Sequence, residues 1–179
     1  MITCDLLIKD TDVLIKSDEL REHVDIAVAD GTILAVGPGL SVEYQAAETM
    51  DGKNKLFMPG LIDSHMHTGQ QLLKGLVLDA KPIIWTRIML PFESTLTPEK
   101  MRLSAQMAAL EMIKSGTAGF IDAGSYFMED AAAVYAASGL RGALSYSTMD
   151  EDGLPESLAM DADEAVSRTD RLYDSFHKK

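Results

Sequence analysis

The chain has 179 residues, 46% of them hydrophobic and 25% charged, which is typical of a soluble globular protein with a sizeable core. Its net charge of -12 repels phosphate backbones and anionic lipid head groups, which argues against nucleic-acid and membrane partners. The one cysteine, Cys4, excludes an intramolecular disulfide framework, and no stretch has the pattern of a signal peptide or a membrane span. We therefore expect a cytoplasmic protein.

Residues 1–57 predict a first domain built of β-strands. The runs "DLLIKD", "DVLIKS" and "VDIAVA" are short and rich in Ile, Leu and Val, as strands are. Asp30-Gly31 separates "VDIAVA" from "TILAVG", and this pair favours the positive φ angles of a tight β-hairpin turn. The sequence therefore predicts a hairpin centred on these two residues.

Residues 58–179 predict a second domain in which strands alternate with helices. "GLIDSH" is apolar enough for a parallel strand buried on both faces. A helix should follow over residues 97–116, with Thr97 as N-cap, Pro98 in its first turn and Gly116 as its stop. "TAGFID", "EDAAAVYAASG" and "LRGALSYS" then predict a strand, a helix and a strand. This alternation indicates an α/β fold with a parallel sheet.

Two histidines stand one residue apart where the strand "GLIDSH" ends. Residues two apart in a strand share one face and lie roughly 6.6 Å apart, so Asp63, His65 and His67 face the same way. Two imidazoles so placed can bind one metal ion, and the carboxyl ends of parallel strands are where α/β proteins carry their sites. An isolated H-x-H is more often a solvated strand end or a pair of hydrogen-bonded core histidines, so the motif needs further support.

Other catalytic motifs are missing from the sequence. Zinc deaminases of the P-C-x-x-C type need at least two cysteines, and this chain has one. No P-loop, dinucleotide-binding GxGxxG or G-x-S-x-G elbow occurs. Asp122 closes the second predicted strand, where we expect a structural role.

The stretch "MDGKNKLFMPGLIDSHMHTG", preceded by "VADGTILAVGPG", resembles the N-terminal region of the metal-dependent amidohydrolase superfamily. The resemblance continues through "LLKGL", "PFESTLTPEKM", "AALEMIKSGTAGFID" and "GLRGALS". It is to the branch that contains S-adenosylhomocysteine and methylthioadenosine deaminases, guanine deaminases and triazine chlorohydrolases. It implies strands of a small β-sandwich over residues 1–57, then the N-terminal part of a (β/α)8 barrel with about three strand–helix units.

The resemblance also assigns roles to five side chains. His65 and His67 match metal ligands of the first barrel strand, for one divalent ion: zinc first, with iron, manganese or nickel as alternatives. Glu93 matches a glutamate that contacts substrate, the alternative being a surface acid beside a helix. Trp85 lies in a segment where active-site loops arise, although a lone Trp is more often a core anchor. Asp63 would orient a ligand by a hydrogen bond, or make a purely structural one.

By this resemblance the function is metal-dependent hydrolysis of a C–N bond, with a small heterocycle such as a purine nucleoside as substrate. The alternatives are a chlorohydrolase or cyclic-amide hydrolase of the same superfamily, and a non-catalytic remnant or assembly module. Homo-oligomers are common in such families, so self-association is a further possibility. An arginine that meets the substrate's tail in adenosine-type members is replaced here by Tyr146, which leaves the substrate open.

The superfamily completes its metal centre with residues of the fifth, sixth and eighth barrel strands. Residues 58–179 accommodate about three strand–helix units, against roughly 250 residues for a closed barrel. No catalytic residue is identifiable in this portion. We therefore expect the chain to be an N-terminal portion of a longer enzyme and to lack activity by itself.

Overall fold

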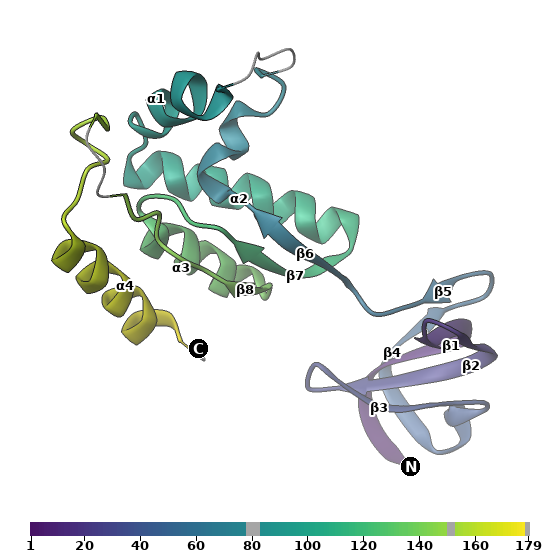
Figure 1. Ribbon diagram of the computed structural model, residues 1–179. Helices are drawn as coiled ribbons and strands as arrows, with labels where there is room; N and C mark the ends of the chain where they lie inside the picture. Colours follow the sequence, from purple (N-terminus) through teal and green to yellow (C-terminus); the bar gives the residue numbers. More distant parts are fainter. Residues whose placement is uncertain (78–82, 150–152, 178–179) are drawn as a thin grey trace. The chain divides into compact units, whose positions relative to one another are not determined.

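The computed structural model describes residues 1–77, 83–149 and 153–177 of the chain. These residues form two compact units, Met1–Pro59 and Gly60–Lys179, each with its own β-sheet (Figure 1). Among the described residues, no helix is long and apolar enough to cross a membrane.

The first unit is a single β-sheet with the strand order β3-β2-β1-β4. Its strands are β1 (Ile2–Lys16), β2 (Glu19–Ala29), β3 (Thr32–Gly37), β4 (Tyr44–Asp51) and β5 (Leu56–Phe57). Strands β1, β2 and β3 pair antiparallel, whereas β4 and the short β5 both run parallel to β1. The two runs "DLLIKD" and "DVLIKS" therefore belong to one long strand, β1, with register shifts along it.

The hairpin between β2 and β3 is confirmed. Asp30 and Gly31 have φ angles of 49° and 67°, the left-handed conformation that a two-residue hairpin turn requires. Successive strand residues point to opposite faces, and the adjacent residues Ile26 and Ala27 are both fully buried. Each belongs to a separate apolar cluster, so both faces of β2 are covered.

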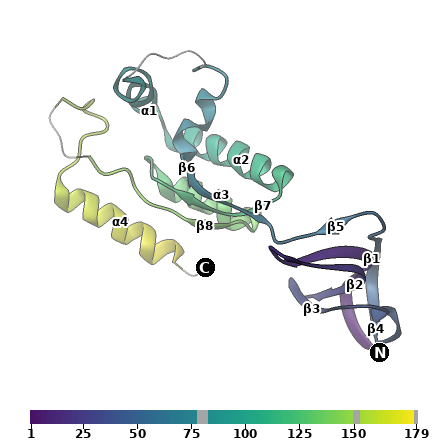
Figure 2. The same ribbon diagram turned by 45° about the vertical axis from the view of Figure 1, so that its right-hand side comes forward.

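The second unit is α/β, as its alternating pattern predicts. Strands β6 (Leu61–Met66), β7 (Thr117–Asp122) and β8 (Arg141–Ala143) are all parallel and lie in the order β6-β7-β8. Helix α2 (Pro98–Ser115) connects β6 to β7, α3 (Met128–Ser138) connects β7 to β8, and α4 (Ala162–Phe176) follows β8 (Figures 1 and 2). A 3₁₀ helix, η2 (Thr68–Leu73), and the short α1 (Leu90–Glu93) lie between β6 and α2.

The predicted ends of α2 are confirmed. The Thr97 side chain accepts a hydrogen bond from the Lys100 backbone N–H at 3.3 Å, and Pro98 occupies the first turn. Gly116 ends the helix with a φ of 79°, which a residue with a side chain rarely adopts. The cap, the proline and the glycine are local signals, and together they fix where this helix starts and stops.

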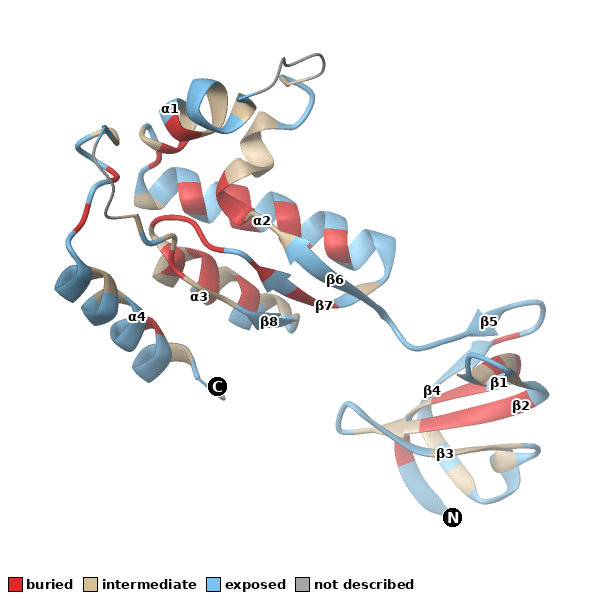
Figure 3. Ribbon diagram, viewed as in Figure 1, coloured by how far each residue is buried: buried red, intermediate tan, exposed pale blue. Residues whose placement is uncertain are grey.

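The core of the second unit lies where α2 and α3 pack on each other and on β7. Met101 of α2 and Met128 of α3 are fully buried, and Phe120 of β7, 3% exposed, belongs to the same apolar cluster. Figure 3 shows the buried positions along α2, α3 and β7. The same cluster contains Leu96, Ala105, Ala108, Ala109, Met112, Ala131, Ala132, Tyr135, Tyr146 and Leu172.

Two expectations for the strands are wrong. Strand β6 is not buried on both faces, because its neighbours Leu61 and Ile62 are 53% and 67% exposed and point to opposite sides. A parallel strand is buried only when layers cover both faces, and β6 is an edge strand whose hydrogen-bonded partner in the described part of the chain is β7. Strand β8 is also shorter than "LRGALSYS", with a separate bridge from Ser125 to Tyr146 beyond it.

Candidate metal centre

His65 and His67 lie together at the carboxyl end of β6. His67 has an extended backbone, with φ of -133° and ψ of 104°, so the two-residue alternation continues past the last residue of the strand. The two imidazole rings meet edge to face with their centroids 5.0 Å apart. His65 is exposed and His67 is half-buried. The structure therefore brings the two predicted ligands side by side with one ring accessible.

The environment of His67 fits a metal ligand. Its Nδ1 lies 3.4 Å from the backbone carbonyl oxygen of Gly124, a long hydrogen bond. A carbonyl oxygen can only accept, so this contact favours the proton on Nδ1 and leaves the lone pair on Nε2 free. Metal-binding histidines commonly use this arrangement, in which the second ring nitrogen is held by a carbonyl or carboxylate.

Two histidines do not complete a metal site. A catalytic zinc ion uses three protein ligands, and the described residues contain no cluster of three or more His, Cys, Asp or Glu side chains able to hold an ion. The pair thus fits a divalent ion as part of a ligand set.

Glu93 is buried, so its interpretation as a surface acid is wrong. Glu93 is the last residue of α1 and is 5% exposed. Its Oε1 accepts a hydrogen bond from Gln70 Nε2 at 2.7 Å. Burial raises the pKa of Glu93, while the Gln70 hydrogen bond and the charge of His67 act in the opposite direction. Gln70 belongs to η2, the segment directly after His67, so η2 connects the histidine pair to a buried carboxyl group.

Asp63 and Trp85 lie outside this arrangement. Asp63 is exposed, and its Oδ1 accepts from the His65 backbone N–H at 3.1 Å, a contact to the backbone and not to an imidazole. Trp85 begins a π-helical turn, Trp85–Met89, and is 46% exposed, so it is not the core anchor that a lone Trp usually is. Their assigned roles remain predictions.

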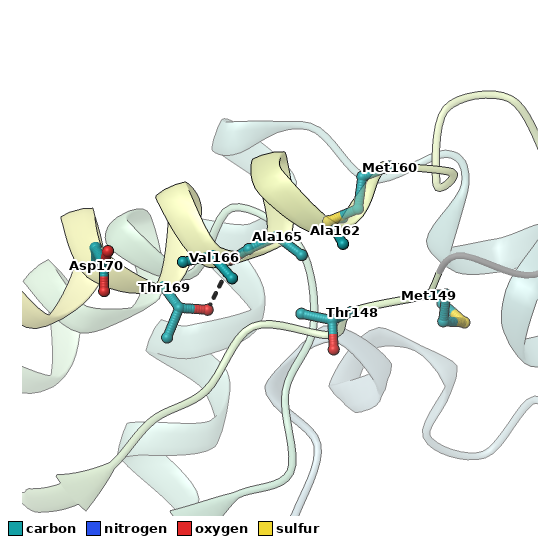
Figure 4. A pocket seen from close by; sticks show the side chains of 8 residues that line it. All are labelled: Thr148, Met149, Met160, Ala162, Ala165, Val166, Thr169 and Asp170. Carbon is teal, nitrogen blue, oxygen red and sulfur yellow. Dashed lines mark hydrogen bonds between the residues drawn. The ribbon is translucent and has the colours of Figure 1, made fainter.

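A cavity of about 380 Å³ lies between α4 and the segment after β8 (Figure 4). It is lined by Thr148, Met149, Met160, Ala162, Ala165, Val166, Thr169 and Asp170. None of the side chains predicted for the metal or the substrate lines it. The site at the end of β6 is therefore separate from this cavity.

Sequence similarity decides the family. Residues 56–175 match the model of the amidohydrolase family, which covers the site and most of the chain. The chain belongs to the amidohydrolase family. The resemblance found in the stretch around "GLIDSHMHTG" is confirmed by this match.

The amidohydrolases to which the chain is similar include deaminases. It is 32% identical, over 97% of its length, to a 5-methylthioadenosine/S-adenosylhomocysteine deaminase of Nitratidesulfovibrio vulgaris, and spans 40% of that protein. It superimposes with a TM-score of 0.88 on an adenosine deaminase from Xanthomonas campestris with bound zinc, at 28% identity over 99% of this chain and 41% of the other.

A third structure shares the fold. A mutant atrazine chlorohydrolase from Arthrobacter aurescens, in complex with zinc and atraton, gives a TM-score of 0.83 at 21% identity over 97% of this chain and 43% of the other. Identity this low supports the fold alone. The chain thus spans about 40% of the length of its relatives.

Three neighbours of the histidines were not identified from the sequence: Thr68, Gln70 and Gly124. Thr68 and Gln70 belong to the polar "TGQ" that directly follows His67, so their position in the chain was a usable signal. Gly124 lies 57 residues from His67, and only its position just after the neighbouring strand β7 hinted at the contact. Residues that follow adjacent parallel strands meet at one edge of the sheet.

Proposed function

We propose that this chain carries part of the metal centre of a hydrolase that deaminates a purine nucleoside or a related heterocycle. The observation that carries the proposal is the pair of facing imidazoles of His65 and His67 at the carboxyl end of β6. Similarity to 5-methylthioadenosine/S-adenosylhomocysteine and 5'-deoxyadenosine deaminases supports the reaction. The fold is then the N-terminal part of a (β/α)8 barrel, with three of its strands in the β6-β7-β8 sheet.

The ion held by His65 and His67 is zinc or a similar divalent metal. When bound, such an ion supplies a hydroxide nucleophile near neutral pH by lowering the pKa of water to about 7. His67 presents Nε2 to the ion because Gly124 occupies its Nδ1. His65 presents its ring from the same side of the strand.

Glu93 is the residue we assign to the substrate. Gln70 holds its Oε1, so Oε2 is the atom that meets a polar group of the heterocycle or its sugar. Burial raises the pKa of Glu93, so its carboxyl group keeps its proton to a higher pH than an exposed glutamate does. Trp85, being exposed, remains available to cover the substrate, and Asp63 keeps a positioning role through the His65 backbone.

Metal binding is the first test. The purified chain is titrated with zinc by calorimetry, alongside His65→Ala, His67→Ala and the control His23→Ala, which changes an exposed histidine of the first unit. We expect the wild type and the His23 variant to bind one zinc ion per chain, and the other two variants to lose it. Equal binding by all four proteins would refute the assignment of the pair.

The reaction is tested by its products. Because two imidazoles are fewer than the three ligands of a catalytic zinc, we expect no turnover by the 179-residue chain alone. A fusion of the chain to the part of the Nitratidesulfovibrio vulgaris deaminase beyond the matched region should release ammonia from 5'-deoxyadenosine or a related nucleoside. Chloride release from a chlorotriazine, with no ammonia from nucleosides, would instead favour the chlorohydrolase alternative, for which the shared fold is the supporting observation.

A further inference from the structure

We infer that Asp122 is a positioning residue for His67. Its carboxylate holds the backbone segment that carries the His67 imidazole, and it also holds Gly124, whose carbonyl oxygen orients that imidazole. The inference rests on the proposed function, since it gives Asp122 a task toward the metal centre. Asp122 is the last residue of β7 and is 2% exposed, and it lies opposite Met66, the last residue of β6. Its carboxylate is therefore buried beside the end of the strand that leads to His67.

The first half of this arrangement is the contact with Thr68. Asp122 Oδ2 accepts a hydrogen bond from the Thr68 backbone N–H at 3.1 Å and a second one from the Thr68 hydroxyl. The Thr68 N–H belongs to the peptide bond that joins His67 to Thr68, and this bond is planar. Holding the N–H therefore fixes the orientation of the backbone from which the His67 ring projects.

The second half is the contact with Gly124. Asp122 Oδ1 accepts from the Gly124 backbone N–H at 2.9 Å, and the carbonyl of the same residue faces His67 Nδ1 at 3.4 Å. Gly124 has a φ of 107°, and a Cβ there would lie 2.9 Å from backbone atoms of Tyr146 and Ser147. The loop at Gly124 is thus tightly packed against the segment after β8, which keeps the carbonyl in place.

Thr68 is itself enclosed by further hydrogen bonds. The Thr68 hydroxyl has one proton, and it donates this proton to Asp122. In the 2.7 Å contact between Thr68 Oγ1 and the Tyr135 hydroxyl, Tyr135 is therefore the donor. The Ser104 hydroxyl donates to the Thr68 carbonyl at 2.6 Å. Thr68 and Ser104 are fully buried and Tyr135 nearly so, which makes these bonds costly to break.

The chemistry of an amide predicts what Asp122→Asn does. Three donors face the carboxylate, two from Thr68 and one from Gly124, and a carboxylate can accept all three. An Asn side chain has one oxygen and one NH₂ group, so in either orientation its NH₂ faces an N–H donor. One half of the arrangement must break, and His67 loses either its fixed backbone or its oriented carbonyl.

The test measures the tautomer of His67 and the affinity for zinc in the 179-residue chain. Imidazole nitrogen chemical shifts are recorded by NMR at about pH 8, where free histidine is neutral. Wild-type His67 should carry its proton on Nδ1, Asp122→Asn should show a mixture of tautomers, and its zinc dissociation constant should rise about 10-fold. The matched control is Ser145→Ala, which removes a 3.1 Å hydrogen bond to the backbone oxygen of Asp122 and should change neither readout.

Each outcome decides between the two proposals. A folded Asp122→Asn protein with an unchanged tautomer and zinc affinity within about twofold overturns the inference, and so does a wild-type His67 protonated mainly on Nε2. A wild-type chain that binds no zinc, yet loses its fixed tautomer in Asp122→Asn, refutes the proposed function but retains the positioning role. If Asp122→Asn does not fold, Asp122→Ser takes its place: it removes the carboxylate oxygens that accept from the Thr68 and Gly124 backbone N–H groups, and an unmixed tautomer would again overturn the inference.

Discussion

Gly69 immediately follows the residue that Asp122 holds, and replacing it with alanine should destabilise the second unit. A Cβ at Gly69 would lie 2.0 Å from Ser125 Oγ and 2.9 Å from Ser125 Cβ, whereas ordinary contacts begin at 3.4 Å. The hydroxyl can rotate away, but the Cβ contact remains, so the backbone of η2 or of the loop at Ser125 must move. Both residues are almost fully buried, which leaves little room for that movement.

The magnitude follows from two opposing effects. Replacing Gly by Ala stabilises a compatible site by about 0.4–1 kcal/mol, because the unfolded chain becomes less flexible. Forcing an extra methyl group into a packed site costs about 1–3 kcal/mol. We therefore expect Gly69→Ala to lower the free energy of unfolding by about 1–2 kcal/mol, as the overpacking outweighs the gain.

A double-mutant cycle measures the clash directly. Urea unfolding is followed by far-UV circular dichroism for Gly69→Ala, Ser125→Gly and the double variant, with Gly37→Ala as a control at a glycine that has open space around it. Removing the Ser125 side chain should recover about 1 kcal/mol or more of the loss in the double variant. Additive effects, or a Gly69→Ala protein as stable as the wild type, would show that the reasoning is wrong.

Three further changes test the charges and the helix cap. Burial raises the pKa of Glu93, so the folded chain binds the proton of this carboxyl group more tightly than the unfolded chain does. Protonated Glu93 therefore adds to the free energy of unfolding at low pH, and this contribution is lost as the pH rises from 4.5 through the raised pKa. Wild type should therefore lose stability relative to Glu93→Gln over that range in urea titrations, and parallel pH profiles would contradict this. The hydrogen bond and charge of Asp10 raise the pKa of His23 above 6.5, so an NMR titration of Asp10→Asn should show a lower value. Thr97→Ala should destabilise α2 by about 1 kcal/mol in urea unfolding, whereas Thr97→Ser should not; equal losses would exclude the cap as the cause.

The prediction that His65, His67 and Asp63 share one side of a strand holds for the two histidines, whereas the partner of Asp63 did not follow from it. The spacing of His65 and His67 predicts two imidazoles on one side of a strand, and the rings do meet at 5.0 Å. The same spacing places Asp63 on that side too, yet its hydrogen bond goes to the backbone N–H of His65. Alternation along a strand determines the side to which a residue points, but it does not determine its partner.

Burial was the least predictable property. "GLIDSH" has the composition of a buried strand, but among the residues that the structure describes β6 is an edge strand, and its Leu61 and Ile62 are exposed. The residues around Glu93 leave open whether it is a surface acid beside a helix, and the structure shows it buried against Gln70, 23 residues earlier. Composition describes what a segment can tolerate, and burial depends on which other segments pack against it.

The sequence by itself determined the features that depend on a few neighbouring residues. These are the turn at Asp30-Gly31, the ends of α2 at Thr97 and Gly116, and the common side of His65 and His67. Only the tertiary structure decided what surrounds the histidines, because Asp122 reaches Thr68 across 54 residues and Gly124 reaches His67 across 57. Such contacts arise where the ends of β6 and β7 become neighbours in a parallel sheet, and no local pattern specifies which side chains then meet.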